Sequence, residues 1–236
     1  MKTLWRFALF IAVVLALQIG AEWAVMHYKM DRFIQYAMED GTVQTDGRTE
    51  PFLDADDDFL GAPGDIPMTF EAINKPISIV VGGHAGVVVD RERVVESSGL
   101  ESWERNVTKY WRNNWRQRYD VVLLLRVRGS SEKQAGRAVL EAEKLLGRRY
   151  DYLFNRGEHW IYCSEVPWVA WRKAGFNLNY DGFQTTPNDI LVSPLTEIIY
   201  LRTTDEDGNR VEYWLREQGT SREAASSNTQ SEQRRN

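Results

Sequence analysis

The pattern of apolar and polar positions predicts six short β-strands. Apolar residues alternate with polar or small ones over 66–70, β-branched and aliphatic residues dominate 77–90 and 120–129, and a short strand over 93–99 follows the first of these after a polar turn. Near the end of the chain, 196–202 and 210–217 have the same character and are separated by the turn-forming sequence DEDGN. Strands of this kind pair through short turns, so the last two are expected to form a hairpin.

Two segments have the spacing of amphipathic helices instead. In 130–147 a serine pair precedes apolar residues at helical intervals and a glycine ends the segment, and 164–175 also runs from a serine to a glycine. Such residues are typical helix boundaries. The aromatic residues of 103–119 recur close to helical spacing as well, whereas 185–194 has the pattern of a loop. Because helices and strands do not alternate as βαβ units, the expected class is α+β, with an antiparallel sheet packed on helices.

The N-terminus has the features of an export signal or a membrane anchor. Lys2 and Arg6 precede an unbroken apolar run over 7–17, and Ile19-Gly20-Ala21 follows as the cleavage site. The run matches the ~7–15 residues of a signal-peptide core and is shorter than the ~20 residues of a spanning helix. Residues 1–26 are therefore expected to be a signal peptide or an N-terminal membrane anchor, which exports the body to the periplasm or cell envelope.

The remainder of the chain divides into three parts. Residues 27–60 are acidic, with the sequence DADDD at 54–58, and are expected to form a connecting arm. Residues 61–217 carry the predicted elements and suffice for one domain with a core. Residues 218–236 lack aromatics and are expected to be a disordered polar tail. The net charge of −5 argues against nucleic acid as a partner.

Cys163 is the single cysteine of the 236-residue chain. An exported protein with one cysteine has no intramolecular disulfide, so the thiol is a buried residue, an intermolecular link or a reactive group. Its place just before a predicted helix favours reactivity, because unpaired N–H groups and the helix dipole stabilise a thiolate. His84, after two glycines, is the candidate base, and His159 is the alternative. The three histidines are scattered, so neither a zinc site nor another cofactor is expected.

Six short motifs occur in the order found in a known family. They are GDI (64–66), HAGVVV (84–89), VVES (94–97), GRRYDYLF (147–154), YCSEVPWVAW (162–171) and TPNDILVSP (186–194). In this order they resemble the permuted NlpC-like cysteine hydrolases of the YiiX/YebB type, over roughly residues 60–200. Those proteins are circularly permuted papain-fold enzymes, in which the histidine strand precedes the cysteine helix. The resemblance implies Cys163 as the nucleophile, His84 as the base and a third polar residue that orients the imidazole.

The orienting residue is predicted from hairpin geometry. If the connection after the histidine strand is the three residues 90–92, Gly86 pairs with Glu96. His84 then lies on the same face of the sheet as Glu96. A connection of two or four residues would turn Glu96 to the opposite face. Glu96 is therefore the predicted third residue, and Ser98 is the alternative.

The expected function is that of an exported thiol hydrolase, a cysteine peptidase or amidase, which cleaves an amide bond of a cell-wall peptide through a thioacyl-enzyme. Tyr150 and Tyr162 flank the cysteine in sequence and are candidates to bind the substrate. The enzymatic alternative is hydrolysis or transfer of a lipid or lipoprotein acyl group. A non-catalytic binding protein of the envelope, on the same fold, is the other alternative. The expected partners are a peptide or acyl substrate and, through the N-terminus, the membrane.

Overall fold

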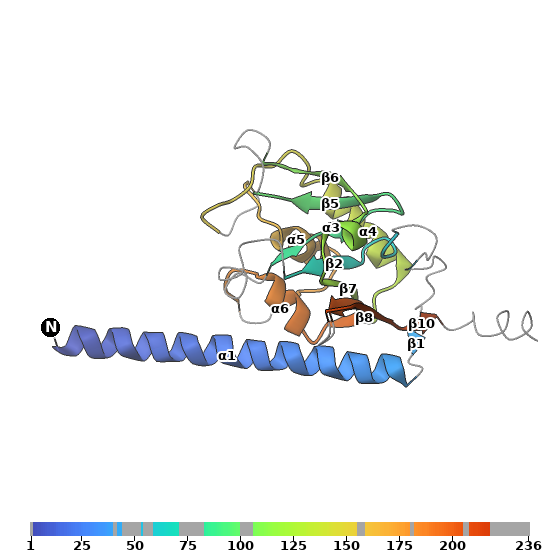
Figure 1. Cartoon of the computed structure of the whole chain (residues 1–236). Coiled ribbons are helices and arrows are strands. Elements are labelled where there is room, and N and C mark those ends of the chain that lie inside the picture. Colours follow the sequence, from blue (N-terminus) through green and yellow to red (C-terminus); the bar gives the residue numbers. More distant parts are fainter. Residues whose placement is uncertain are drawn as a thin grey trace, which may run out of the picture.

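The computed structural model describes residues 2–39, 42–43, 53, 59–70, 83–99, 106–154, 159–179, 182–204 and 208–217. Within these ranges the chain forms an α+β fold, as expected, in which antiparallel sheets pack with helices. Figure 1 shows the larger sheet between the smaller sheet, at one end of the domain, and a long N-terminal helix that runs past the opposite side.

The larger sheet has the strand order β3 (His84–Ala85), β2 (Ile66–Thr69), β7 (Val122–Val127), β8 (Thr196–Thr204) and β9 (Arg210–Trp214). All its neighbouring strands are antiparallel. The apolar residues of β7 do not alternate with polar ones, because this strand lies inside the sheet and all its residues are buried. The strands predicted at 66–70, 120–129, 196–202 and 210–217 are confirmed.

The smaller sheet has the order β4 (Val87–Val88), β5 (Arg93–Ser97) and β6 (Thr108–Arg112). The strand predicted over 93–99 is confirmed as β5. Two short strands, β1 (Thr42–Val43) and β10 (Arg216–Glu217), pair in parallel. The helices are α1 (Lys2–Met38), α3 (Trp115–Arg118), α4 (Glu132–Glu143), α5 (Glu165–Lys173) and α6 (Pro187–Val192). The helices predicted over 130–147 and 164–175 are α4 and α5, with shorter bounds. Of the strand predicted over 77–90, residues 77–82 lie outside the described residues, and β3 and β4 fall in the rest.

Two predictions of secondary structure are wrong. The aromatic segment 103–119 is not one helix, because β6 pairs with β5 along its whole length and, of the described residues 106–119, only the four of α3 are helical. The segment 185–194 is not only a loop, because it contains α6. Thr186 caps this helix: its hydroxyl accepts from the Asp189 backbone N–H, and the Asp189 carboxylate accepts from the Thr186 N–H.

Part of the predicted connecting arm belongs to the domain. Phe33, on α1, is buried, and Met30 and Ile34 of the same helix pack against the core. Leu60, at the other end of the arm, is fully buried. The core therefore includes apolar residues of a segment that, from its acidic composition, was expected to lie outside the domain. The predicted tail, 218–236, lies outside the described residues.

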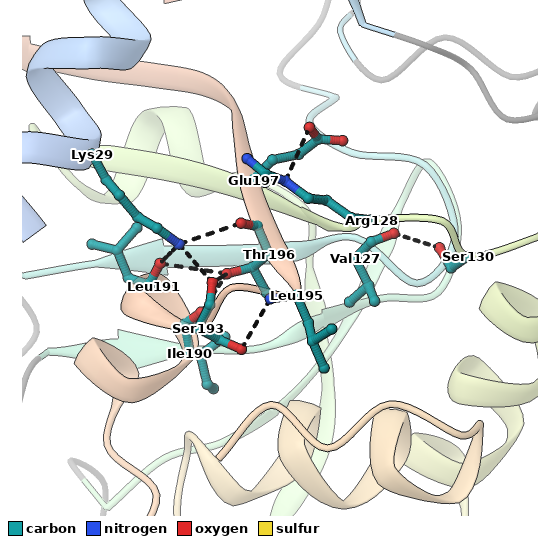
Figure 2. Close-up of polar contacts among 10 residues, drawn as sticks. All are labelled: Lys29, Val127, Arg128, Ser130, Ile190, Leu191, Ser193, Leu195, Thr196 and Glu197. Carbon is teal, nitrogen blue, oxygen red and sulfur yellow. Dashed lines mark hydrogen bonds and ion pairs between the residues drawn. The ribbon is translucent and has the colours of Figure 1, made fainter. Parts of the chain in front are cut away.

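Lys29 fixes the packing of α1 on the domain (Figure 2). Its ammonium group donates to the carbonyl oxygens of Leu191 at 2.8 Å, Ser193 at 2.6 Å and Thr196 at 3.4 Å. The carbonyls of Leu191 and Ser193 lie at the C-terminal end of α6, where a positive charge is favoured by the helix dipole, and that of Thr196 belongs to the start of β8. Burial, helped by the charge of Arg128, lowers the pKa of Lys29 to about 8.

In the described part of the chain, no helix combines the length and the apolar character needed to cross a membrane.

A buried ion pair joins β7 to the turn before β2. Arg126 donates from Nε and Nη2 to the two carboxylate oxygens of Asp65, at 2.9 and 2.7 Å. The Asp65 side chain is fully buried and that of Arg126 is 2 % exposed. Asp65 also accepts from the backbone N–H of Ala62 at 2.9 Å. The aspartate of the GDI motif is thus explained by structure: it neutralises a charge inside the domain.

Candidate active site

His84 begins β3 at a point where only glycine can precede it. Gly83 has a φ of +90°, and a Cβ at this position would lie 1.8 Å from the carbonyl oxygen of Thr69. The pair Thr69–His84 is in register between β2 and β3. The close approach of the two strands therefore fixes the backbone of His84, whose side chain is buried.

Glu96 reaches the imidazole of His84 across the junction of the two sheets. Val87 pairs with Val95. This is the register that places Gly86 opposite Glu96, and the three-residue connection is confirmed. Glu96 Oε2 lies 2.9 Å from His84 Nε2. A Cβ on Gly86 would lie 2.9 Å from Glu96 Cγ, so the glycine leaves room for the carboxylate.

The carboxylate of Glu96 is fully buried and has two further partners, both from α3. Trp115 Nε1 donates to Oε1 at 2.8 Å. Arg118 forms a bidentate pair with it, from Nη2 to Oε1 at 2.5 Å and from Nη1 to Oε2 at 3.2 Å. The Trp115 ring also stacks on the imidazole of His84, with 5.5 Å between centroids and 10° between planes. One short helix therefore holds both the carboxylate and the imidazole.

Cys163 lies directly before Ser164, the N-cap residue of α5. Its thiol is buried and donates to the carbonyl oxygen of Gly83 at 3.8 Å, and the neighbouring His84 favours the ionised form of the thiol. Since Nε2 of His84 faces Glu96, Nδ1 is the nitrogen left for the thiol. The backbone N–H groups of Ala85 and Ser164 also favour the thiolate. The structure thus brings together Cys163, His84 and Glu96, the three residues that the sequence nominated.

The charges of these groups support one another. Burial alone would lower the pKa of His84, but hydrogen bonds to Cys163 and Glu96, and their negative charges, raise it to about 9. Burial opposes ionisation of Cys163 too, yet the imidazolium and the backbone donors lower its pKa below the ordinary value. Against its own burial, Glu96 has a lowered pKa, because of His84 first and of Arg118 next. The arrangement favours a thiolate–imidazolium pair backed by a carboxylate.

The two tyrosines named from the sequence have different surroundings. Burial raises the pKa of the Tyr150 hydroxyl, and the neighbouring Cys163 thiolate raises it further. Tyr162 is buried as well, but its hydroxyl accepts from the backbone N–H of Thr185 at 3.0 Å. Tyr150 is therefore placed to touch a reacting group, whereas Tyr162 ties the cysteine segment to the chain before α6. The alternative base, His159, is exposed.

Trp115 and Arg118 were missed by sequence reasoning. Both lie in the aromatic segment 103–119, outside the six motifs of the resemblance. Nothing local marks them as partners of a glutamate 19 and 22 positions earlier. The signal that could have found them is chemical. A carboxylate that orients a histidine inside a domain needs its own buried donors, and Trp and Arg are the natural ones.

We expect alkylation of Cys163 to persist at mildly acidic pH. The folded-state pKa of the thiol is lowered and that of His84 is raised to about 9, so the ion pair spans the neutral range. Iodoacetamide labelling, followed by intact mass, should change little between pH 8 and pH 6. The thiolate of free N-acetylcysteine, with a pKa of ~8.5, should fall by about two orders of magnitude over the same interval. A parallel fall for Cys163 would show that no ion pair exists.

Among the described residues, no cluster of three or more histidine, cysteine, aspartate or glutamate side chains could hold a metal ion.

No family model and no curated protein matches the chain. Among solved structures, the chain is similar to "metalloprotein yiiX from Escherichia coli O157:H7, DUF1105". The TM-score is 0.49 and the sequence identity 20 %, over 58 % of this chain and 95 % of that chain.

Proposed function

We propose that this protein is an exported thiol hydrolase with a permuted papain-like, NlpC-like domain, and that it cleaves an amide bond in a cell-wall peptide. The observation that carries the proposal is the buried row of Cys163, His84 and Glu96, with the pKa of the thiol lowered and that of the imidazole raised. A residue that only fills the core needs no such partners. The chain order also fits, because the histidine strand precedes the cysteine helix.

The proposed reaction uses each group in turn. The Cys163 thiolate attacks the carbonyl carbon of the amide and forms a tetrahedral adduct whose oxygen carries the negative charge. Nearby donors, the Tyr150 hydroxyl and the backbone N–H of Ser164, stabilise this oxygen. The imidazolium of His84 donates its proton to the leaving nitrogen, the C–N bond breaks, and a thioester with Cys163 remains. Water then gives a proton to His84, attacks the thioester carbonyl and releases the acid, while the sulfur leaves as the thiolate.

Glu96 acts by keeping the imidazole of His84 oriented and favouring its protonated form. Arg118 and Trp115 in turn keep the carboxylate ionised and in place. These two are positioning residues, since they touch neither the thiol nor a substrate.

We also propose that the N-terminal segment directs the domain to the periplasm or cell envelope, which fractionation of expressing cells would test.

A lipid or lipoprotein acyl group is the second candidate substrate, favoured by exposed apolar side chains near the cysteine segment. Leu153 is 73 %, Phe183 65 % and Trp160 40 % exposed. Trp160 is three residues from Cys163, and the Thr185 backbone links the Phe183 region to Tyr162. Apolar surface of this kind is suited to an acyl chain. A binding protein that retains the fold without the reaction is the third candidate.

Trapping of the acyl-enzyme separates the three candidates. Purified protein is mixed with peptide amides of cell-wall composition or with lipid acyl esters, quenched in acid and weighed intact. A mass increase on Cys163 from the peptides supports the proposal, and one from the lipids alone replaces it with the second candidate. A reactive thiol that neither class acylates points to the binding protein. The Cys163→Ser variant is the control for non-covalent adducts.

A further inference from the structure

Four large hydrophobic side chains on the segments before and after α5 are exposed. They are Leu153, Trp160, Phe183 and Tyr152, and we refer to them as the rim. In the rest of the described domain, outside α1, exposed side chains of this kind occur one to an element, as Tyr110 on β6, Leu140 on α4 and Trp214 on β9. Single residues of this kind are ordinary, whereas a group of them marks a surface that meets another molecule.

Contacts through Tyr162 bring the two segments of the rim together. The ring of Phe154, which follows Leu153, packs edge-on against the ring of Tyr162, with 5.0 Å between centroids. The Tyr162 hydroxyl accepts from the backbone N–H of Thr185, two residues after Phe183. Both segments therefore meet at the residue that directly precedes the nucleophile.

The backbone holds the rim at the surface. Asn179, which is buried, donates from Nδ2 to the carbonyl oxygen of Phe183 at 2.8 Å, and its Oδ1 accepts from the N–H of Gly182 at 2.8 Å. Phe154 has a φ of +51°, the one positive φ among the described non-glycine residues. Such a conformation persists only where its surroundings enforce it, and it is common at functional surfaces. The exposure of Leu153 and Phe183 is therefore a property of a fixed backbone.

A positive charge accompanies the rim. Arg149 and Trp160 form a parallel β-bridge, so their side chains leave the backbone on the same side, and both are exposed. Tryptophan is enriched at the level of lipid headgroups, and arginine near a membrane is attracted to anionic lipids. An arginine beside an exposed tryptophan therefore suits the surface of a bilayer.

The helix α1 points in the same direction as the rim. Figure 1 shows its N-terminal half projecting beyond the domain, on the side where the chain between α4 and α5 and the chain between α5 and α6 form loops. These loops carry the rim. Within the apolar run 7–17 of the projecting half, each side chain that the structure describes is exposed. The apolar surface of α1 and that of the rim thus lie toward one side of the molecule.

We propose that the rim docks on the surface of a lipid bilayer, beside the point where α1 enters the lipid. The apolar side chains of the rim enter the interface, and the guanidinium group of Arg149 meets the lipid phosphates. Because the rim borders the cysteine segment, docking turns this side of the candidate site toward the membrane. Docking needs neither Cys163 nor His84, so it does not rest on the proposed reaction.

Photo-crosslinking to lipid tests the docking on the full chain with Cys163→Ser, so that hydrolysis plays no part. The protein is reconstituted in vesicles of phosphatidylethanolamine and phosphatidylglycerol that carry a diazirine on the acyl chain, and crosslinked peptides are identified by mass spectrometry. Crosslinks in α1 report entry of the helix into lipid and serve as the internal standard. We expect crosslinks at Leu153, Trp160 and Phe183 as well, and none at Leu140, which is 59 % exposed on α4.

Phe183→Asp should lower crosslinking of the rim, relative to α1, about tenfold, because a charge opposes entry into lipid. Leu140→Asp, the same change on α4, should leave it unchanged. Arg149→Gln should lower it about fivefold, the usual contribution of one basic residue near an anionic surface.

Crosslinks in α1 without crosslinks on the rim would overturn the proposal. Equal labelling of Leu140, or crosslinking of the rim that Phe183→Asp leaves unchanged, would overturn it as well, because contact with lipid would then be unspecific. If α1 itself is not crosslinked, the proposal and the predicted N-terminal anchor are both wrong.

Discussion

Replacement of His84 by alanine is expected to lower alkylation of Cys163 at pH 6 by about two orders of magnitude, because the thiol returns toward its ordinary pKa of ~8.5. Hydrolysis of any substrate that acylates Cys163 should fall by about 10²- to 10⁴-fold, the range for loss of a general base. Intact-mass labelling and initial rates measure the two effects. Cys163→Ser should abolish both.

Glu96→Gln should reduce labelling less than His84→Ala does, since an amide still contacts the imidazole but no longer favours its protonated form. Ser98→Ala, one residue beyond the end of β5, is the control and should behave as the wild type. If Glu96→Gln labels like the wild type, the carboxylate has no part in the reaction. If Ser98→Ala alone reduces labelling, the register is right and the chosen side chain is wrong.

The largest expected loss of stability comes from Asp65→Ala. This change leaves the guanidinium group of Arg126 buried without its partner, and such a loss costs about 3–5 kcal/mol. Urea unfolding followed by tryptophan fluorescence measures it. Arg128→Gln is the control two residues along the chain, because the Arg128 side chain is 58 % exposed and its pair with Glu197 spans 3.5 Å (Figure 2). Its effect should stay within about 1 kcal/mol.

The double variant Asp65→Leu/Arg126→Met distinguishes a buried charge from a general weakness of this region. Removal of both charges should recover part of the stability that Asp65→Ala loses, since no unpaired ion remains. If the double variant is as unstable as the single one, the cost comes from packing. An Asp65→Ala variant as stable as Arg128→Gln would contradict the assignment of a buried pair.

The sequence predicts most reliably what depends on neighbouring residues. The length of the 90–92 connection alone decides the face of Glu96, and this register is confirmed. The boundaries of α5 follow from a serine and a glycine. In contrast, Trp115 and Arg118 act on a residue far away in the chain, and only the complete fold brings α3 to the carboxylate. The aromatic spacing of 103–119 wrongly suggested a helix. Neighbouring aromatic residues there belong to the strand β6, whose alternate side chains point to opposite faces of the sheet.

The single helix α1 has a consequence for the order of events during synthesis. The predicted cleavage site after Ala21 lies within it, and a peptidase acts on chain that is locally unfolded. Lys29 of α1 binds carbonyl oxygens at the end of α6. These residues leave the ribosome roughly 165 residues after Lys29, which takes about 10–30 s at ordinary rates of translation. Cleavage and docking are thus separated in time. A chain that completes its folding with the helix intact is expected to keep its N-terminal segment.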